Sequence, residues 1–155
     1  GTIGSNIRLG DQEVSDQALA DAAAAVHLDS FLDRLSKGFD EEVGERGANL
    51  SAGQKQLISF ARALAHDPQV LILDEATTAL DPKNEAAICE TLSKLRGELT
   101  ILAISHQPSV LDVADRAYPL EGGNAFLVTD RITESAEEKD ASTAFVQAYG
   151  QSRST

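Results

Sequence analysis

Two adjacent acidic residues, Asp74 and Glu75, directly follow a short apolar run at residues 70–73. A run of this length without polar alternation is typical of a strand buried on both faces of a parallel sheet. Open α/β sheets place their ligands at the carboxyl ends of such strands. There, one carboxylate can hold Mg²⁺, directly or through water, and the other can orient or deprotonate an attacking water. An ordinary solvated acidic turn is the alternative for this pair.

The segment before this run predicts a helix whose start suits a phosphate group. Asn49 and Ser51 are residue types that cap helix N-termini, and Gly53 has no Cβ, so another molecule can approach the backbone closely there. Apolar residues recur three and four positions apart over residues 54–65, which predicts an amphipathic helix that Pro68 terminates. Its start would direct N–H groups and the positive end of the helix dipole outward. An ordinary capped core helix is the alternative.

Four short motifs resemble those of ATP-binding cassette (ABC) ATPases, and they stand in that family's order. LSAGQ, which ends at Gln54, resembles the signature loop, and LILDEA resembles the Walker B strand with its catalytic glutamate, Glu75. TALD, which ends at Asp81, resembles the D-loop, and AISH ends at a residue similar to the switch histidine, His106. EEVGERG resembles the X-loop of exporter-type cassettes. The resemblance covers roughly residues 1–128.

The resemblance implies three roles for residues that serve nucleotide bound to their own cassette. Asp74 would position Mg²⁺, and Glu75 would act on the attacking water. His106 would contact the γ-phosphate and help hold that water in line, whereas a lone histidine after a strand is more often structural. Glu75 and His106 are therefore the predicted catalytic residues.

The resemblance also implies contacts with nucleotide held by a second cassette. Ser51, Ala52, Gly53 and Gln54 would touch the ATP bound by the partner, and Asp81 would link the two sites across the dimer. Ala52 departs from the family's pattern, because glycine is usual at its position and one extra methyl group can crowd the backbone near phosphate.

The sequence contains no P-loop, the motif of two glycines five apart followed by Lys and Ser or Thr that cradles the β and γ phosphates. The opening residues, GTIGSNI, resemble the stretch that follows the Q-loop in exporter cassettes, so we expect this sequence to begin just after that loop. As given, the chain is expected neither to bind ATP tightly nor to turn it over.

The expected fold class is α/β. The resemblance implies a partial P-loop NTPase fold of the ABC type, with a mostly parallel sheet flanked by helices and a helical signature subdomain. The partial ATPase domain is expected at residues 1–128, with the helical and signature region at about 8–66 and the Walker B to H-loop core at 67–128. Residues 129–155 are expected to be a weakly helical or disordered tail.

Several smaller elements are also predicted. Ser15 is expected to cap a helix with an apolar face that includes Leu19 and Val26, and a second short helix is expected to continue to Gly38. A helix over residues 85–95 is expected to turn one face inward. That face comprises Ala86, Ile88, Leu92 and Leu95. The remaining expectations are a buried strand, a short helix and a closing hairpin around two glycines, at residues 99–104, 107–113 and 116–128.

Composition excludes several function classes. The 155 residues carry a formal charge of −12 with a pI of about 4.5, which argues against a nucleic-acid partner. One cysteine, Cys89, excludes an internal disulfide framework and is expected to be inert packing. No apolar run approaches the length of a membrane span.

The favoured function is part of the ATP-hydrolysing domain of an ABC exporter, which couples ATP binding and hydrolysis to transport. The implied partners are a second ATPase domain, identical or different, and transmembrane domains that would hold the chain at the cytoplasmic face of the plasma membrane. Glu45 and Arg46 are candidates for contact between domains. Two alternatives remain: a soluble ABC ATPase not linked to transport, and a truncated cassette that acts as a non-catalytic regulatory or binding module.

Overall fold

The computed structural model describes residues 1–121, 124–125, 129–130 and 144–148. The chain divides into two compact units, and each is described by itself. The first unit comprises Gly1–Pro68 and Ala79–Thr91, and the second comprises Gln69–Thr78 and Leu92–Thr155. The architecture is α/β, as expected. Among the described residues, no helix has both the length and the apolar character needed to cross a membrane.

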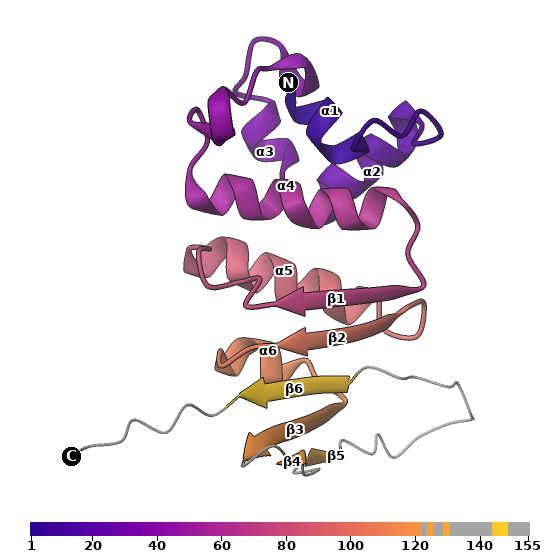
Figure 1. Cartoon of the computed structure of the whole chain (residues 1–155), viewed down its shortest axis with the longest axis vertical. Coiled ribbons are helices and arrows are strands. Elements are labelled where there is room, and N and C mark those ends of the chain that lie inside the picture. Colours follow the sequence, from indigo (N-terminus) through magenta and orange to yellow (C-terminus); the bar gives the residue numbers. More distant parts are fainter. Residues whose placement is uncertain (122–123, 126–128, 131–143, 149–155) are drawn as a thin grey trace, which may run out of the picture. The chain divides into compact units, whose positions relative to one another are not determined.

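The first unit is helical, and its longest helix is α4 (Ala52–Ala65), against which α1 and α2 pack (Figure 1). The other helical elements are α1 (Ile3–Arg8), α2 (Asp16–Ala25), α3 (Asp29–Leu32), η1 (Gly38–Asp40), η2 (Glu45–Gly47) and the start of α5 (Pro82–Lys94). The predicted helix at 54–65 is confirmed within α4, and Ser51 is its N-cap. Leu57, Phe60 and Ala61 are buried. The helix ends before Asp67, whose φ is +47° and therefore lies outside the helical range.

Helix α1 was not predicted from the sequence. Thr2 caps it by accepting a hydrogen bond from the backbone N–H of Ser5 at 3.1 Å, and Ile3 and Ile7 are completely buried. Six residues give too few repeats for a helical period, and Gly4 lowers the intrinsic helix propensity further. A Cβ at Gly4 would lie 3.3 Å from a backbone carbonyl oxygen, so this glycine is required by close packing.

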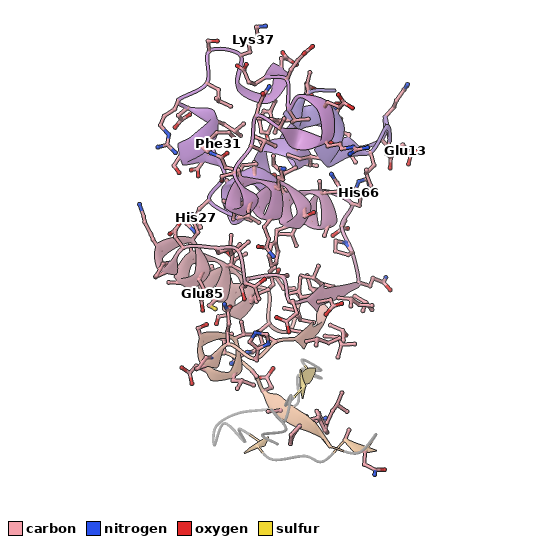
Figure 2. All side chains as sticks on the ribbon, turned by 60° about the vertical axis from the view of Figure 1, so that its left-hand side comes forward. Glu13, His27, Phe31, Lys37, His66 and Glu85 are labelled. Atoms are coloured by element: carbon pink, nitrogen blue, oxygen red, sulfur yellow. The ribbon has the colours of Figure 1, made fainter. Side chains whose placement is uncertain are left out.

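Helix α2 begins as predicted, but the helix after it is shorter than expected. Ser15 accepts a hydrogen bond from the N–H of Ala18 at 3.1 Å, which confirms the cap. The predicted second helix does not reach Gly38, because α3 ends at Leu32 and Gly38 instead begins η1. His27 follows the end of α2 with a φ of +56°, and its side chain is exposed (Figure 2).

The second unit contains a sheet in the order β1-β2-β6-β3-β4, with β5 also paired to β3 (Figure 1). Strands β1 (Val70–Asp74), β2 (Thr100–Ile104), β6 (Ala144–Ala148) and β3 (Arg116–Glu121) run parallel, and β4 (Asn124–Ala125) and β5 (Thr129–Asp130) run antiparallel to β3. The short helix between β2 and β3 is confirmed as α6 (Pro108–Asp112). The core of this unit includes Ile101, Ala103 and Val110.

Strand β1 is not buried on both faces, which corrects the prediction from its apolar run. Leu71 and Leu73 are buried, but Val70 and Ile72 are 56% and 65% exposed. Successive residues of a strand point to opposite faces, so one whole face of β1 lies open to solvent. An apolar run shows that a strand can be covered on both faces, but the number of layers that cover it depends on the rest of the assembly.

The C-terminal tail differs from its prediction at residues 144–148. The expected weak helix is wrong there, because these residues form β6, which pairs with β2 and β3. Ala144, Phe145 and Ala148 fit a helical face, but a run of only five residues does not distinguish the two states, and pairing on both sides supplies backbone hydrogen bonds to a strand. The rest of the predicted tail lies outside the described residues, as does part of the predicted closing hairpin, of which β3 and β4 are described.

Helix α5 buries a slightly different face from the one predicted. Ile88, Cys89 and Leu92 are buried and Leu95 is half-buried, but Ala86 is exposed. Each residue advances about 100° around a helix, so position 86 lies about 200° from position 88 and cannot share its face. The prediction for Ala86 is therefore wrong. Cys89 is a buried thiol outside any disulfide.

Candidate functional site

The loops that follow β1 and β2 bring Glu75 and His106 into direct contact within the second unit. The two strands are parallel and in register, and the last pair is Asp74 with Ile104. The N–H of Glu75 donates to the carbonyl of Ile104 at 2.9 Å, and Glu75 then turns the chain with a φ of +50°. As a result, Nδ1 of His106 lies 2.8 Å from Oε1 of Glu75.

Both side chains of this pair are partly exposed, although the Oε2 atom of Glu75 is buried. The side chain of His106 is 61% exposed and that of Glu75 is 38% exposed. An exposed ion pair contributes little to stability because water screens it. A left-handed backbone is also unfavourable for a residue other than glycine. The strained turn and the exposed contact are therefore better explained by chemistry at the surface than by stabilisation of the fold.

Asp74 lies next to this pair, at the exposed end of β1. It fits the kind of magnesium site in which one protein carboxylate holds the ion together with water and phosphate oxygens. Among the described residues there is no group of three or more His, Cys, Asp or Glu residues that could enclose a metal ion. Mg²⁺ in phosphate-transfer sites uses one or two protein carboxylates and completes its shell with water and phosphate oxygens. The single carboxylate of Asp74 fits that pattern, and Mg²⁺ bound through Asp74 stays a prediction.

The predicted phosphate-binding residues Ser51 to Gln54 form the first turn of α4 in the first unit. The hydroxyl of Ser51 accepts from the N–H of Gln54 at 3.1 Å, and the side chain of Gln54 accepts from the N–H of Ser51 at 2.8 Å, which is a capping box. Ala52 and Gly53 follow, and their N–H groups belong to the first turn, where a helix has no carbonyl acceptor for them. These two amides and the hydroxyl hydrogen of Ser51 remain available to an anion. Asn49 is not the cap; its amide donates to the carbonyl of Glu42 at 3.1 Å.

The D-loop contacts the same helix. The N–H of Ala79 donates to the side chain of Gln56 at 3.1 Å, and a Cβ added at Gly53 would lie 3.3 Å from the carbonyl oxygen of Ala79. The close approach expected at Gly53 therefore occurs within this chain. The sequence alone did not identify Gln56, because a glutamine within a helix carries no motif.

Asp81, predicted to contact nucleotide across a dimer, caps helix α5 in the structure. Its carboxylate accepts from the N–H groups of Lys83 and Asn84, each at 3.1 Å, and from the Asn84 side chain at 2.6 Å. The hydrogen bond from the Asn84 backbone is the main cause that lowers the pKa of Asp81 below its ordinary value of 3.8. A contact between Asp81 and nucleotide stays a prediction.

A cavity of about 360 Å³ lies in the first unit beside the X-loop. Arg46, Lys55 and Arg62 line it, and no acidic residue is among the described residues of its wall. Val43 and Ile58 form part of the wall and are buried. Sequence reasoning found Arg46 but not Lys55 and Arg62, because only the fold shows which cations line one cavity.

A family model also matches this chain, which has carboxylates and a histidine at its strand ends and a capped start of α4. The model described as ABC transporter matches residues 2–78. The chain belongs to the ABC transporter family. The ABC relatives include the uncharacterized ABC transporter ATP-binding protein YknV of Bacillus subtilis, which is 46% identical over 123 residues. That alignment covers 79% of this chain and 20% of YknV.

Another Bacillus subtilis relative is named "Probable multidrug resistance ABC transporter ATP-binding/permease protein YheH". It is 43% identical over 123 residues, which cover 79% of this chain and 18% of YheH. A solved structure described as a bacterial Atm1-family ABC exporter with ATP bound matches with a TM-score of 0.75 and 37% identity, over 81% of this chain and 22% of that chain. The chain thus spans about a fifth of the length of these relatives.

These likenesses confirm the partial P-loop NTPase fold and the exporter-type ABC assignment made from the motifs. The family binds nucleotide, and ATPase activity is a property of the family. The descriptions of these two relatives and of the solved structure name transporters and an exporter, and none of the three names a soluble ABC ATPase.

Proposed function

We propose that this chain is part of the ATP-hydrolysing nucleotide-binding domain of an ABC exporter and couples ATP binding and hydrolysis to transmembrane transport. The observation that carries the proposal is the 2.8 Å contact between Glu75 and His106, beside Asp74, at the carboxyl ends of two parallel strands. This is the edge where open α/β sheets bind ligands. Glu75 and His106 are the proposed catalytic residues.

Glu75 is the proposed general base for hydrolysis of ATP. Its carboxylate would accept a proton from the water that attacks the γ-phosphate, and a positioned base of this kind contributes about 10²- to 10⁴-fold in rate. With Nδ1 of His106 directed at Glu75, Nε2 is left for a phosphate oxygen, to which it donates in the imidazolium form. His106 would thereby hold the γ-phosphate and the carboxylate in fixed positions. Mg²⁺ held through Asp74 would neutralise charge on the phosphate oxygens.

The first turn of α4 is proposed to bind ATP held by a second ATPase domain, either identical or different. Support comes from the free first-turn amides of Ala52 and Gly53 and from the hydroxyl of Ser51, which its capping bond leaves able to donate. The capping box keeps Gln54 from occupying these donors.

The chain alone is proposed to be inactive in ATP hydrolysis, because its sequence contains no P-loop lysine or glycine-rich cradle for the phosphates. The exposed face of β1, with Val70 and Ile72, supports a complementary part of the ATPase domain that covers it. Burying each of these side chains would contribute up to about 1.5–3 kcal/mol. That gain favours assembly with the segment that supplies the cradle.

The transmembrane part of the exporter is the second proposed partner, and it would hold the chain at the cytoplasmic face of the plasma membrane. The cavity beside the X-loop supports this contact, because its basic side chains and buried apolar residues suit a protein segment. A photo-crosslinker at Ser59, which lines the cavity, is expected to attach to the transmembrane part. The same probe at Lys37, an exposed residue of this unit (Figure 2), is the control and is expected not to attach. Equal labelling from both positions would contradict this docking site.

The experiment that tests the proposed function is ATP turnover by the transporter that carries this chain. Glu75→Gln keeps the size of the side chain but cannot accept the proton, so kcat is expected to fall at least 100-fold, the lower end of the range of about 10² to 10⁴. Glu98→Gln, at an exposed turn of the same unit, is the matched control and should leave kcat unchanged. Full turnover by Glu75→Gln would refute the assignment of the base.

A further inference from the structure

The loops after β1 and β2 contain an unusual pair of buried polar side chains. Among the described residues, the buried polar side chains are Thr77, Thr91 and Ser105. Two of these three flank the Glu75–His106 pair: Thr77 is 3% exposed and follows Glu75 by two residues, and Ser105 is 6% exposed and precedes His106. Burying a hydroxyl is unfavourable unless it is hydrogen-bonded, so their contacts require an explanation.

Both hydroxyls bond to one residue, Gln107. The hydroxyl of Thr77 donates to the side-chain oxygen of Gln107. The backbone N–H of Gln107 donates to the hydroxyl of Ser105 at 3.1 Å. Gln107 is therefore held through its side chain by the loop after β1 and through its backbone by the loop after β2, directly beside His106.

We propose that Thr77 is a positioning residue for ATP hydrolysis: through Gln107 it sets the separation of the loops that carry Glu75 and His106. In this role Thr77, which is 3% exposed, acts through Gln107 and not by contact with nucleotide or water. The inference rests on the proposed function, because it assigns a purpose to Thr77 only if Glu75 and His106 act on nucleotide.

Two contacts join these loops, Glu75–His106 and Thr77–Gln107, and they differ in how far water can replace them. The Glu75–His106 contact is open to water and lies where nucleotide would enter, so water competes for both partners and phosphate competes for His106. The Thr77–Gln107 hydrogen bond is shielded on the Thr77 side, where no water replaces it if it breaks. The shielded bond therefore keeps the loops in place while the exposed pair exchanges partners.

The turn at Glu75 gives a second reason for this arrangement. Its φ of +50° is unfavourable for glutamate and persists only where surrounding contacts hold it. Thr78 holds the start of the turn, because its hydroxyl donates to the carbonyl of Glu75 at 2.9 Å. Thr77 holds the end of the turn against the neighbouring loop. Loss of that bond lets the carboxylate of Glu75 move away from its working position.

The test is a steady-state measurement of ATP hydrolysis in the full transporter that carries this chain. Thr77→Val keeps the shape of the side chain and removes the hydroxyl. We expect kcat to fall about 10- to 100-fold, because a displacement on the order of 1 Å can cost about 10²-fold in rate. KM is expected to stay within about twofold, since Thr77 is not a binding residue. Thr77→Ser restores the hydroxyl and is expected to keep kcat within about threefold of the wild type.

A double-mutant cycle identifies the partner. Gln107→Leu is expected to lower kcat as much as Thr77→Val does, and the double variant is expected to be no slower than either single variant. Losses that multiply in the double variant would overturn the inference. If Thr77→Val does not fold, Gln107→Leu decides alone, because Gln107 is only partly buried. Wild-type kcat in Gln107→Leu would then overturn it.

Thr91→Val is the matched control for a merely structural threonine. Thr91 is 7% exposed, and its hydroxyl donates to the carbonyls of Ala25 and Ala87 in the other unit. This variant is expected to lower the melting temperature and leave kcat unchanged. A kcat loss in Thr91→Val equal to that in Thr77→Val would overturn the inference.

The proposed function and this inference fail in different ways. If Glu75→Gln retains full turnover, the proposed function fails. If Glu75→Gln abolishes turnover while Thr77→Val keeps wild-type kcat, only the positioning role fails. Equal impairment of Thr77→Val and Thr77→Ser would show that the hydroxyl is not what matters and would also overturn the role.

Discussion

The capping box at the start of α4 gives a stability prediction that can be worked out from its geometry. Ser51→Ala removes the oxygen that accepts from the N–H of Gln54 at 3.1 Å and leaves the other bond of the box, at 2.8 Å, chemically possible. Replacing a serine N-cap with alanine costs typically about 1 kcal/mol. For a chain of this size, about 1 kcal/mol corresponds to a fall of about 2–4 °C in melting temperature.

A second Ser→Ala substitution on the same helix distinguishes the loss of the N-cap hydrogen bond from the general effect of replacing serine with alanine. Ser59 is exposed within α4, where alanine is the better helix former by up to about 0.5 kcal/mol. Ser59→Ala is therefore expected to be neutral or slightly stabilising. The two variants should differ by about 1.5 kcal/mol, or about 3–6 °C, although the chemical change is identical.

Thermal melting followed by circular dichroism measures this difference, and amide hydrogen exchange locates it. The N–H of Gln54 is expected to exchange faster in Ser51→Ala, because its acceptor is gone, and to be unaffected in Ser59→Ala. Equal melting temperatures for the two variants, together with unchanged exchange at Gln54, would refute the role given to Ser51 as the cap of this helix.

Two further predictions concern acid stability and the core. The pKa of Asp81 is lowered mainly by the Asn84 backbone N–H. The contribution of the Asp81 carboxylate to folding stability is therefore complete above the ordinary pKa of 3.8, and it is lost as pH falls through the lower pKa of the folded state. The drop in melting temperature between pH 5 and pH 3 should therefore be smaller in Asp81→Asn, and an equal drop would contradict the cause given. Ile101→Ala, at a completely buried position, should cost about 2–5 kcal/mol in urea unfolding, against less than about 1 kcal/mol for Ile72→Ala at a position 65% exposed. Similar costs for both would show that the face of β1 is not open.

The sequence predicted the elements whose signals are local. Helix α4 has a cap, an apolar period and a terminating Pro68, and each signal acts within a few residues, so the structure has it where expected. Strands β1 and β2 end in chemistry-bearing residues, and parallel pairing in register brings Glu75 and His106 together. The resemblance of LILDEA and AISH to the family's motifs predicted these two residues, and each follows the end of a strand.

The features that the sequence missed depend on contacts between distant segments. The open face of β1 depends on which layers cover it, and an apolar run carries no information on that. Segment 144–148 became a strand because β2 and β3 offer pairing on both sides. Thr77 and Gln107 are 30 positions apart, and only the fold joins them, so neither could be singled out from its residue type.

Glu75 is proposed to remove the proton from the attacking water and to take no part in holding the nucleotide. The most direct test incubates the transporter that carries this chain with radiolabelled ATP and identifies the nucleotide that remains bound. The wild type is expected to retain ADP, and Glu75→Gln is expected to retain intact ATP with unchanged affinity. ADP in the Glu75→Gln protein at the wild-type rate, or loss of ATP binding in that variant, would contradict the claim.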